Sequence, residues 1–348
     1  MTAPHASPPE YNITGISYAD RSHFRYGGPL IDVHSHITMT DPAESTSGFP
    51  GGAGRSGSIA QAELLLETAR EFGIERTYTM CPPQDIPPLR ERFGPLLGFN
   101  GPVHKEPHES NDVAYRLLDR FLEQGVDIIK FWGPPRMSDA GQPVDAPWRL
   151  EVVRRARAAG VRVFMLHISD PDAWFATAYA DVIRYGTKQE HYYGLHLLMR
   201  MFPDVTWIGA HLGGDPEDPD HLEELLELYP HLYLDTSATK WQVREVSRQR
   251  DDIRALVRRH PTRILFGVDL LTRHAQVREH YVSRYWCQRT LWESGWDGPS
   301  PIADADYIPK PGEPPSTQLR GLGLPVDVLR QVYYENVLRI LPRRATQS

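Results

Sequence analysis

Short runs of apolar, β-branched and aromatic residues recur along the chain and alternate with longer amphipathic segments. The spacing of apolar residues predicts helices over 59–73, 112–125, 148–160 and 221–230, and several of these segments end in the Gly that is common just after a helix. Strands that alternate with helices in this way require a parallel sheet with helical crossovers. The runs that we predict to be strands are 30–36, 75–80, 95–100, 126–132, 161–167, 205–211, 232–238 and 263–269.

The number of strand–helix units favours one closed barrel. Eight such units within about 240 residues fit a (β/α)8 barrel of the TIM type better than an open doubly wound sheet. We therefore expect a single domain over 29–342, preceded by an N-terminal arm (1–28) and followed by a short tail (343–348). Within that domain, the segment 321–342 predicts a final amphipathic helix.

The overall composition argues against nucleic acids and membranes as partners of the protein. The chain has 348 residues, a formal net charge of −7 and no basic stripe, so we do not expect it to bind a nucleic acid. Two cysteines, Cys81 and Cys287, are too few for a disulfide framework, and the first residues do not resemble a signal peptide, so we expect a cytoplasmic location. No stretch approaches the roughly 20 apolar residues that span a bilayer, and no membrane association is expected.

Polar side chains interrupt the apolar pattern at the ends of several predicted strands. The carboxyl ends of the strands of a (β/α)8 barrel meet on one face, where the active sites of such enzymes lie. His34 and His36 are two residues apart, so their side chains should point to the same side of the first strand. The residues at these strand ends are His34, His36, Lys130, His167, His211 and Asp269.

Together these residues predict a metal site. A lone histidine at a strand end is more often a hydrogen-bonding residue than a ligand, but four histidines and an aspartate at converging strand ends favour a metal. We expect His34, His36, His167 and Asp269 to bind a divalent cation and to leave one position open for water. Zn²⁺ is the expected ion, although Mn, Fe and Co accept the same ligands.

Several motifs carry a resemblance to a known family. The stretches "DVHSH", "FMLH", "IGAHLGG" and "ILFGVD" resemble the strand motifs of the amidohydrolase superfamily, specifically its amidohydrolase-2 branch, and "QVYYENVLRIL" is similar to the asparagine-containing helix that closes many of those chains. The resemblance covers about residues 28–342. It implies that His34, His36 and His167 are metal ligands, that Asp269 is a ligand or a proton shuttle, and that His211 is a further ligand or polarises substrate or water.

The resemblance leaves the role of Lys130 open. In dinuclear members of the superfamily a lysine on the fourth strand is carbamylated and bridges two metal ions, whereas in many mononuclear members the lysine at that place serves packing or substrate binding. We favour one ion, with Lys130 and His211 as the residues that would hold a second.

The ligand set is compatible with more than one reaction. The leading hypothesis is hydrolysis of an amide, lactone or related carbonyl-type bond by a metal-activated water, with Asp269 moving the proton and His211 stabilising the oxyanion. The alternative is non-hydrolytic decarboxylation of an aromatic or unsaturated carboxylic acid, which the same branch also catalyses. A non-catalytic metal-binding barrel is a minor alternative.

Residues on the loops after the strands indicate the kind of substrate. Arg136, Arg273 and His274 lie on loops expected at the active face, where an arginine can hold a carboxylate, although a solvent-facing arginine is equally compatible with the sequence. Trp132 and other aromatic residues near the expected mouth favour a planar ligand. We therefore predict a small cyclic or aromatic substrate, and the arm together with the aromatic segment 280–300 suggests a homodimer.

Overall fold

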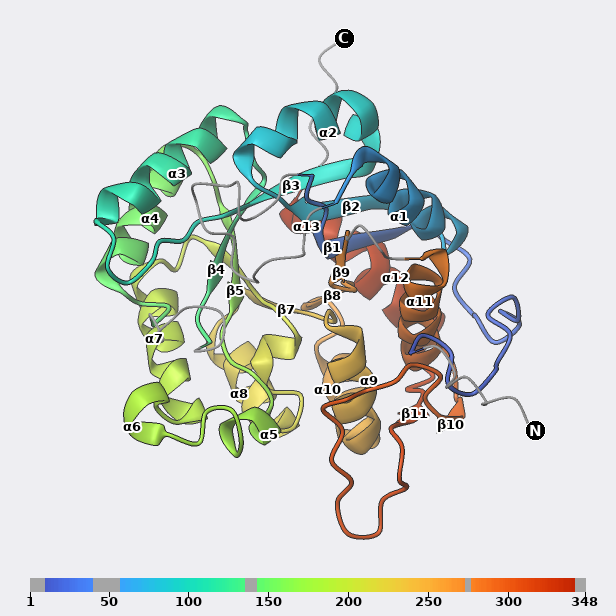
Figure 1. Ribbon diagram of the computed structural model, residues 1–348. Coiled ribbons are helices and arrows are strands. Elements are labelled where there is room, and N and C mark those ends of the chain that lie inside the picture. The colour runs from blue at the N-terminus through green and yellow to red at the C-terminus, as the bar shows by residue number, and fades with distance from the viewer. Residues whose placement is uncertain (1–9, 40–56, 135–142, 273–276, 342–348) are drawn as a thin grey trace, which may run out of the picture.

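The computed structural model describes residues 10–39, 57–134, 143–272 and 277–341. A single parallel sheet runs through it in the order β8-β7-β6-β5-β4-β3-β2-β1-β9 (Figure 1). Its strands are β1 (Leu30–His36), β2 (Ile74–Met80), β3 (Leu97–Pro102), β4 (Ile128–Trp132), β5 (Val163–His167), β6 (Thr206–Gly209), β7 (Leu232–Asp235), β8 (Ile264–Leu265) and β9 (Leu270–Leu271).

The sheet closes on itself through the segment 264–271. The first part of this segment, β8, pairs with β7, and its last part, β9, pairs with β1. The backbone between them also bonds to β1, because Val33 donates to the carbonyl of Phe266 and Asp269 donates to that of His34. The predicted (β/α)8 barrel is therefore confirmed. The predicted continuous strand 263–269 is wrong in its second half, since residues 266–269 bend out of regular strand geometry.

Helices surround the sheet (Figure 1). The four helices predicted from the apolar spacing form as α1, α3, α4 and α8, each within a few residues of the expected ends. The helices are α1 (Ile59–Glu71), α2 (Ile86–Phe93), α3 (Asn111–Glu123), α4 (Pro147–Ala158), α5 (Asp172–Phe175), α6 (Val182–Tyr185), α7 (Lys188–Met201), α8 (Pro219–Leu228), α9 (Thr239–Arg248), α10 (Arg250–Arg259), α11 (Arg278–Glu293), α12 (Val326–Arg330) and α13 (Asn336–Ile340). A small antiparallel hairpin pairs β10 (Asp297–Pro299) with β11 (Gln318–Arg320).

Two apolar clusters follow from the alternation of side chains along the strands. One face of each strand contributes to the layer between sheet and helices, as Phe164 and Leu166 of β5 do. The other face fills the barrel, where Val163 and Met165 of the same strand meet residues such as Ile208. Further along this inner row stands His167, so the regular pattern of β5 itself carries a polar side chain to the mouth of the barrel.

The C-terminal helix closes the barrel from the other end. Val337 and Leu341 of the α13 region pack with the apolar residues inside the barrel. The buried amide of Asn336 donates hydrogen bonds of 2.8 Å to the carbonyls of Pro261 and Ile264, directly before and within β8. The predicted final helix thus forms over residues 326–340, and its asparagine ties it to the backbone around β8, which precedes Asp269.

Residues 10–28 of the N-terminal arm lie along α11 (Figure 1). The indole of Trp286 donates to the carbonyl of Asp20, and Tyr18 packs edge-to-face against the same indole. His23 is 2.8 Å from the hydroxyl of Thr290. These contacts fix the start of the described chain next to a helix whose other residues reach the mouth of the barrel.

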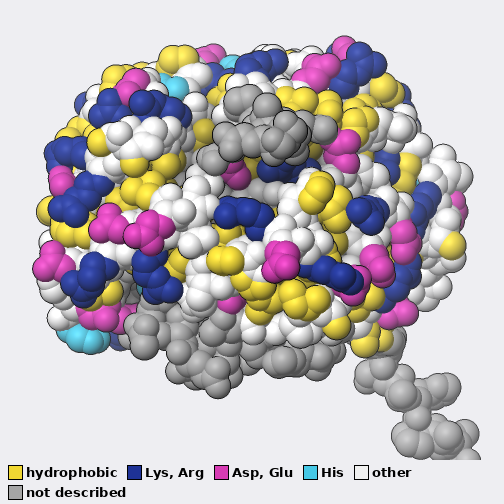
Figure 2. Space-filling model, turned by 90° about the horizontal axis from the view of Figure 1, so that it is seen from above, with side chains coloured by type: hydrophobic (Ala, Val, Ile, Leu, Met, Phe, Trp, Pro, Cys, Tyr) yellow, Lys and Arg dark blue, Asp and Glu magenta, His cyan; other side chains and the backbone are white. Residues whose placement is uncertain are grey.

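The surface carries both signs of charge. On the face shown in Figure 2, Lys and Arg side chains are interspersed with Asp and Glu and do not form a continuous basic stripe. None of the helices in the described part of the chain is both long and apolar enough to cross a membrane.

Candidate metal and active site

A cavity of about 510 Å³ opens at the carboxyl ends of the strands. Every strand-end residue predicted from the sequence lines it except Lys130, which is fully buried on the inner face of β4. The other residues that line this cavity are Glu10, Trp132, Asp170, Pro171, Trp174, Ala238, Thr239, Lys240, Trp241, Arg244, Val268, Leu270, Leu271, His280, Arg284, Asp304 and Asp306.

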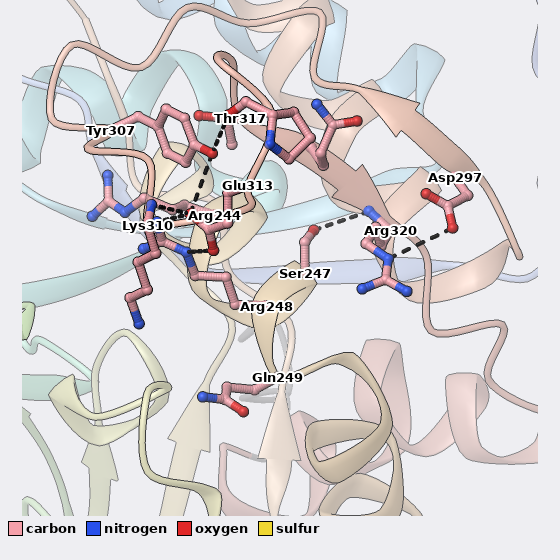
Figure 3. A pocket seen from close by; sticks show the side chains of 12 residues that line it. Arg244, Ser247, Arg248, Gln249, Asp297, Tyr307, Lys310, Glu313, Thr317 and Arg320 are labelled. Atoms are coloured by element: carbon pink, nitrogen blue, oxygen red, sulfur yellow. Dashed lines mark hydrogen bonds and ion pairs between the residues drawn. The ribbon is translucent and has the colours of Figure 1, made fainter.

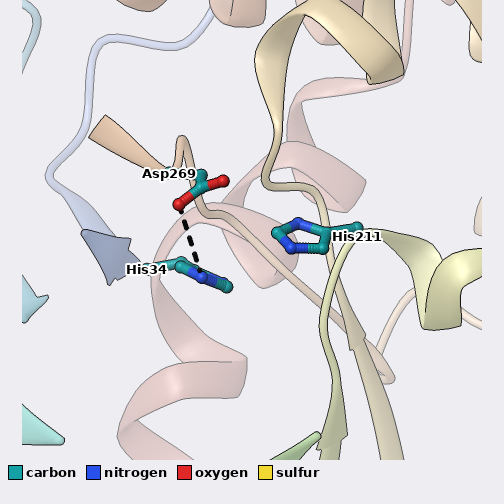
Figure 4. Close-up of side chains that lie close together, drawn as sticks. All are labelled: His34, His211 and Asp269. Atoms are coloured by element: carbon teal, nitrogen blue, oxygen red, sulfur yellow. Dashed lines mark ion pairs between the residues drawn. The ribbon is translucent and has the colours of Figure 1, made fainter. Parts of the chain in front are cut away.

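Three of the predicted residues bring ligand atoms close together at this end of the barrel (Figure 4). His34, His211 and Asp269 each offer one nitrogen or oxygen, and these atoms all lie within 4.8 Å of one another. His34 comes from β1, His211 follows β6 and Asp269 follows β8, so the site depends on the closed barrel. Two imidazoles and one carboxylate at this spacing are a suitable donor set for a divalent transition-metal ion.

Each of these three side chains is directed by a departure from regular strand geometry. Val33 packs inside the barrel, so strict alternation would turn His34 outward, but the pairing of β1 with β2 is irregular between Asp32 and Ser35. His211 (φ 59°) and Asp269 (φ 62°) have left-handed backbone conformations that are uncommon for residues other than glycine. Local irregularity of this kind re-aims side chains and is common next to active sites.

Behind the two histidines, Asp235 and Ser237 at the end of β7 fix the orientation of the rings. Nδ1 of His34 is 2.8 Å from Oδ2 of Asp235, and Nδ1 of His211 is 2.7 Å from Oγ of Ser237. The Ser237 hydroxyl contacts Oδ1 of Asp235, and Nδ1 of His34 also lies 2.9 Å from Oγ. A consistent network has both Nδ1 atoms protonated as donors and Ser237 donating to Asp235, which leaves the Nε2 lone pairs available.

Burial and charge set the protonation of the site. Burial lowers the pKa of His36 to about 4 even though Asp269 opposes this, and burial together with the nearby His167 and His34 lowers the pKa of His211 well below its ordinary value. Burial alone would raise the pKa of Asp269, but His34 and His36 outweigh it and lower that pKa. Neutral imidazoles and an ionised carboxylate are the forms in which these residues bind a cation.

His36 and His167 lie beside this group of three in different ways. Nε2 of His36 is 3.1 Å from Oδ1 of Asp269, so His36 is within reach of the same centre. Nε2 of His167 is instead 3.0 Å from Oδ1 of Asp170, although its ring packs edge-to-face on that of His211 with 4.5 Å between centroids. The structure therefore brings all the predicted ligands to one cavity and places His211 closer to the centre than His167.

Lys130 points along the inner row of β4 toward this site. Its side chain is fully buried, and Nζ has no hydrogen-bond partner among the described residues. Burial lowers its pKa to about 8, while the carboxylates of Asp235 and Asp269 act in the opposite direction.

Tryptophans form the walls of the cavity. Trp132 lies nearly parallel to the ring of His36, with 6.5 Å between centroids, and Trp241 lies 5.5 Å from the ring of His211. Trp174 is the third indole that lines the cavity. These flat apolar surfaces suit a planar ligand. The predicted substrate residues Arg136, Arg273 and His274 lie outside the described residues.

A second cavity of about 550 Å³ lies under the segment that connects β10 to β11 (Figure 3). The positive charge of Arg248 in its wall is already paired, because the guanidinium lies 2.7 Å from Glu313 and 3.2 Å from Glu245. Tyr307 stands over this pair and its hydroxyl donates to the carbonyl of Pro314. This cavity therefore lacks the open donor set of the first one.

An acidic group near α7 is likewise occupied by a side chain of the protein. The amine of Lys188 lies 2.7 Å from Asp172, 2.6 Å from Asp215 and 3.0 Å from Glu217. The ammonium of Lys188 therefore occupies the centre of these carboxylates and joins α5, α7 and the loop before α8.

The sequence did not single out the residues that orient the ligands or those on α11. Asp235 and Ser237 end the predicted strand 232–238, so their place at a strand end was a signal that could have identified them. His280 and Arg284 gave no such signal, because they belong to a helix and reach the cavity only through its packing against the barrel.

Solved structures share this fold. A TIM-barrel protein from Bordetella bronchiseptica is 14% identical over 90% of this chain and 98% of its own, with a TM-score of 0.55. A 2,6-dihydroxybenzoate decarboxylase from Rhizobium is 15% identical over 90% and 98% of the two chains, with a TM-score of 0.50. A dihydroxybenzoic acid decarboxylase from Polaromonas, solved with bound manganese and the inhibitor 2-nitroresorcinol, is 14% identical over 91% and 98%, with a TM-score of 0.51.

The chain shares the fold of these structures, the first of which is a TIM-barrel protein. This likeness agrees with the TIM-type barrel predicted from the sequence. Identities of 14–15% carry the fold alone, so they do not choose between hydrolysis and decarboxylation. No family model matches the sequence, and the curated proteins contain no match to it.

Proposed function

We propose that this protein is a metal-dependent hydrolase that cleaves an amide, lactone or related carbonyl-type bond in a small cyclic or aromatic substrate. The observation that carries the proposal is the position of His34, His211 and Asp269, whose ligand atoms lie within 4.8 Å of one another beside a tryptophan-walled cavity of about 510 Å³. A cavity of this size accommodates a small molecule.

The residues of the site divide the chemical work. A divalent cation, most simply Zn²⁺, with Mn, Fe and Co as alternatives, would supply the positive charge that makes hydroxide available near neutral pH. His34 and His211 would hold it through Nε2, because their Nδ1 atoms are engaged with Asp235 and Ser237. This arrangement suits His211 as a ligand better than as a donor to an oxyanion.

Asp269 is the group that we assign to proton transfer. Its Oδ1 lies 3.1 Å from His36 and 3.6 Å from His34, and its side chain is 24% exposed to the cavity. The carboxylate would accept a proton from the attacking water and pass it to the leaving group. The amide of an asparagine at position 269 cannot accept this proton and release it again.

Labelled water tests the proposal. The metal-loaded protein should hydrolyse at least one member of a panel of cyclic and aromatic amides and lactones and incorporate ¹⁸O from solvent into the product. Asp269→Asn should lower kcat by roughly a hundredfold or more. A wild-type rate in Asp269→Asn would contradict the assigned role, and product without ¹⁸O would contradict hydrolysis.

Decarboxylation is the second candidate. It is favoured by two structures of the same fold that are dihydroxybenzoate decarboxylases, one of them with bound manganese. In this case the protein would release CO₂ from an aromatic carboxylic acid, and Asp269 in its protonated form would donate to the ring carbon. CO₂ release with no solvent ¹⁸O in the organic product would establish this reaction in place of hydrolysis.

A further inference from the structure

Helix α11 brings two nitrogen-rich side chains to the wall of the cavity. His280 and Arg284 are four residues apart, so they lie on the same face of the helix, and both line the cavity that contains His34 and Asp269. Neither residue belongs to the group that would hold the cation. Their position makes them candidates for contact with the part of a substrate that does not react.

The charge of Arg284 is poorly compensated within the described residues. Its side chain is 5% exposed, and Nη1 donates a 2.9 Å hydrogen bond to the hydroxyl of Ser283. The carboxylate paired with it, that of Glu10, stands 3.9 Å from Nη2, which is beyond hydrogen-bond distance. A buried guanidinium is stable only when an anion or several acceptors satisfy its donors.

Arg244 in the same cavity wall has a fully paired positive charge. Its Nη1 lies 2.6 Å from Asp304, and its Nε pairs with Glu245. Both arginines are nearly buried, so the difference lies in the partners and not in exposure. Arg244 is therefore a structural cation, whereas Arg284 has donors left for an anion that enters the cavity.

Glu10 marks the place where such an anion would sit. One oxygen of its carboxylate, Oε1, lies 3.7 Å from Nδ1 of His280 and 3.9 Å from Nη2 of Arg284. Glu10 is itself 60% exposed and is held by its backbone carbonyl, which accepts from Ala303. The Glu10 carboxylate thus lies near both side chains, and an anion that enters the cavity could displace it.

We propose that Arg284, assisted by His280, is a binding site for a carboxylate of the substrate. The substrate is then a planar or cyclic carboxylic acid whose ring lies among the tryptophans and whose carboxylate pairs with the guanidinium, while the reacting bond lies over His34, His211 and Asp269. This inference rests on the proposed function for the statement that the bound acid is a substrate. An arginine can hold a carboxylate through two parallel hydrogen bonds, which fixes orientation as well as charge.

Calorimetric titration with benzoate and with its neutral isostere benzamide tests the site. The protein as purified should bind benzoate more tightly than benzamide, and Arg284→Gln should weaken benzoate binding roughly tenfold or more while leaving benzamide unchanged. Arg258→Gln, an exposed arginine on α10, is the matched control and should bind both probes as the wild type does. Equal binding of the two probes by the wild type, or unchanged benzoate binding by Arg284→Gln, would overturn the proposal.

A second variant keeps the proposal testable if Arg284→Gln does not fold. Glu10→Gln removes the competing carboxylate at an exposed position and should strengthen benzoate binding about two- to fivefold, since an exposed charge contributes modestly. Benzamide binding should not change. An unaltered benzoate affinity in Glu10→Gln would contradict the assigned place of the carboxylate.

The same titration on chelator-treated protein separates this inference from the proposed function. If benzoate binding disappears when the metal is removed, then the metal holds the benzoate. This result would overturn the carboxylate site. Arg284-dependent binding that survives chelation supports the site, even if the turnover experiments with labelled water show no hydrolysis.

Discussion

At the scale of single residues, the orientation of the candidate metal ligands depends on two side chains that do not line the cavity. Asp235 contacts Nδ1 of His34, and Ser237 contacts Nδ1 of both His34 and His211, so the two residues determine which nitrogen of each ring is protonated. Mutation of such outer partners typically lowers metal affinity by about tenfold to a hundredfold.

Removal of the Ser237 hydroxyl should therefore weaken metal binding without unfolding the protein. We expect Ser237→Ala to lower the affinity for Zn²⁺ by roughly tenfold to a hundredfold, because Nδ1 of His211 loses its acceptor. A competition titration with a chromogenic chelator measures this. Ser237→Thr, which retains a hydroxyl, is the control, and an unchanged affinity in Ser237→Ala would show that the network does not orient the rings.

The protonation of His36 predicts how stability depends on pH. Its folded pKa is about 4, below the ordinary 6.5, so the unfolded chain binds more protons in this range and stability is lost as the pH falls from about 6.5 to about 4. The loss from this residue alone is about 3 kcal/mol. His211, whose pKa is also lowered, acts in the same direction.

Urea denaturation of the chelator-treated protein across this pH range provides the measurement. His36→Gln should lose less stability on acidification than the wild type, because glutamine does not titrate. Parallel pH curves for the two proteins would contradict the assignment.

Sequence patterns identified which residues line the cavity but not the backbone geometry that directs their side chains. His34, His36, His167, His211 and Asp269 were all recognisable as polar interruptions at strand ends, and they line one cavity. The irregular pairing before His34 and the left-handed backbone of His211 and Asp269 were not recognisable, because no glycine marks these three positions. The selection of His34, His211 and Asp269 as the closest group depends on those bends.

At the scale of elements, the strands and the helices α1, α3, α4 and α8 were predictable because each has a clear apolar period. The break between β8 and β9 was not, since the sequence 263–269 remains apolar through the bend. Helix α11 was not predicted as a helix, and its burial on nearly all sides explains why it lacks a simple amphipathic pattern.

The helix that closes the barrel provides a prediction about stability. Asn336→Ala removes two buried hydrogen bonds to the backbone around β8 and leaves their carbonyl acceptors unsatisfied, so it should lower the free energy of unfolding by about 2–4 kcal/mol. Urea denaturation measures the change, and Asn111→Ala on the exposed start of α3 is the matched control. A loss no larger than that of the control would show that Asn336 does not secure the barrel.

At the scale of the whole molecule, closure of the barrel is what creates the site. The three candidate ligands come from positions 34, 211 and 269, and the bonding of the segment 266–271 to β1 brings the end of the sheet back to its start. The fold was predictable from the alternation of strands and helices, whereas the reaction was not, because the loops that select a substrate carry little periodic signal. Binding of a metal at this seam should also stabilise the folded barrel, since the ligands are separated in the unfolded chain.

The central claim is that His34, His211 and Asp269 form a metal site, and elemental mass spectrometry tests it most directly. Protein purified without chelator and then incubated with Zn²⁺ should retain about one ion per chain. The double variant His34→Ala/His211→Ala should retain almost none while keeping the circular dichroism of the wild type. Wild-type protein without bound metal under these conditions, or a double variant with an unchanged ratio, would contradict the account.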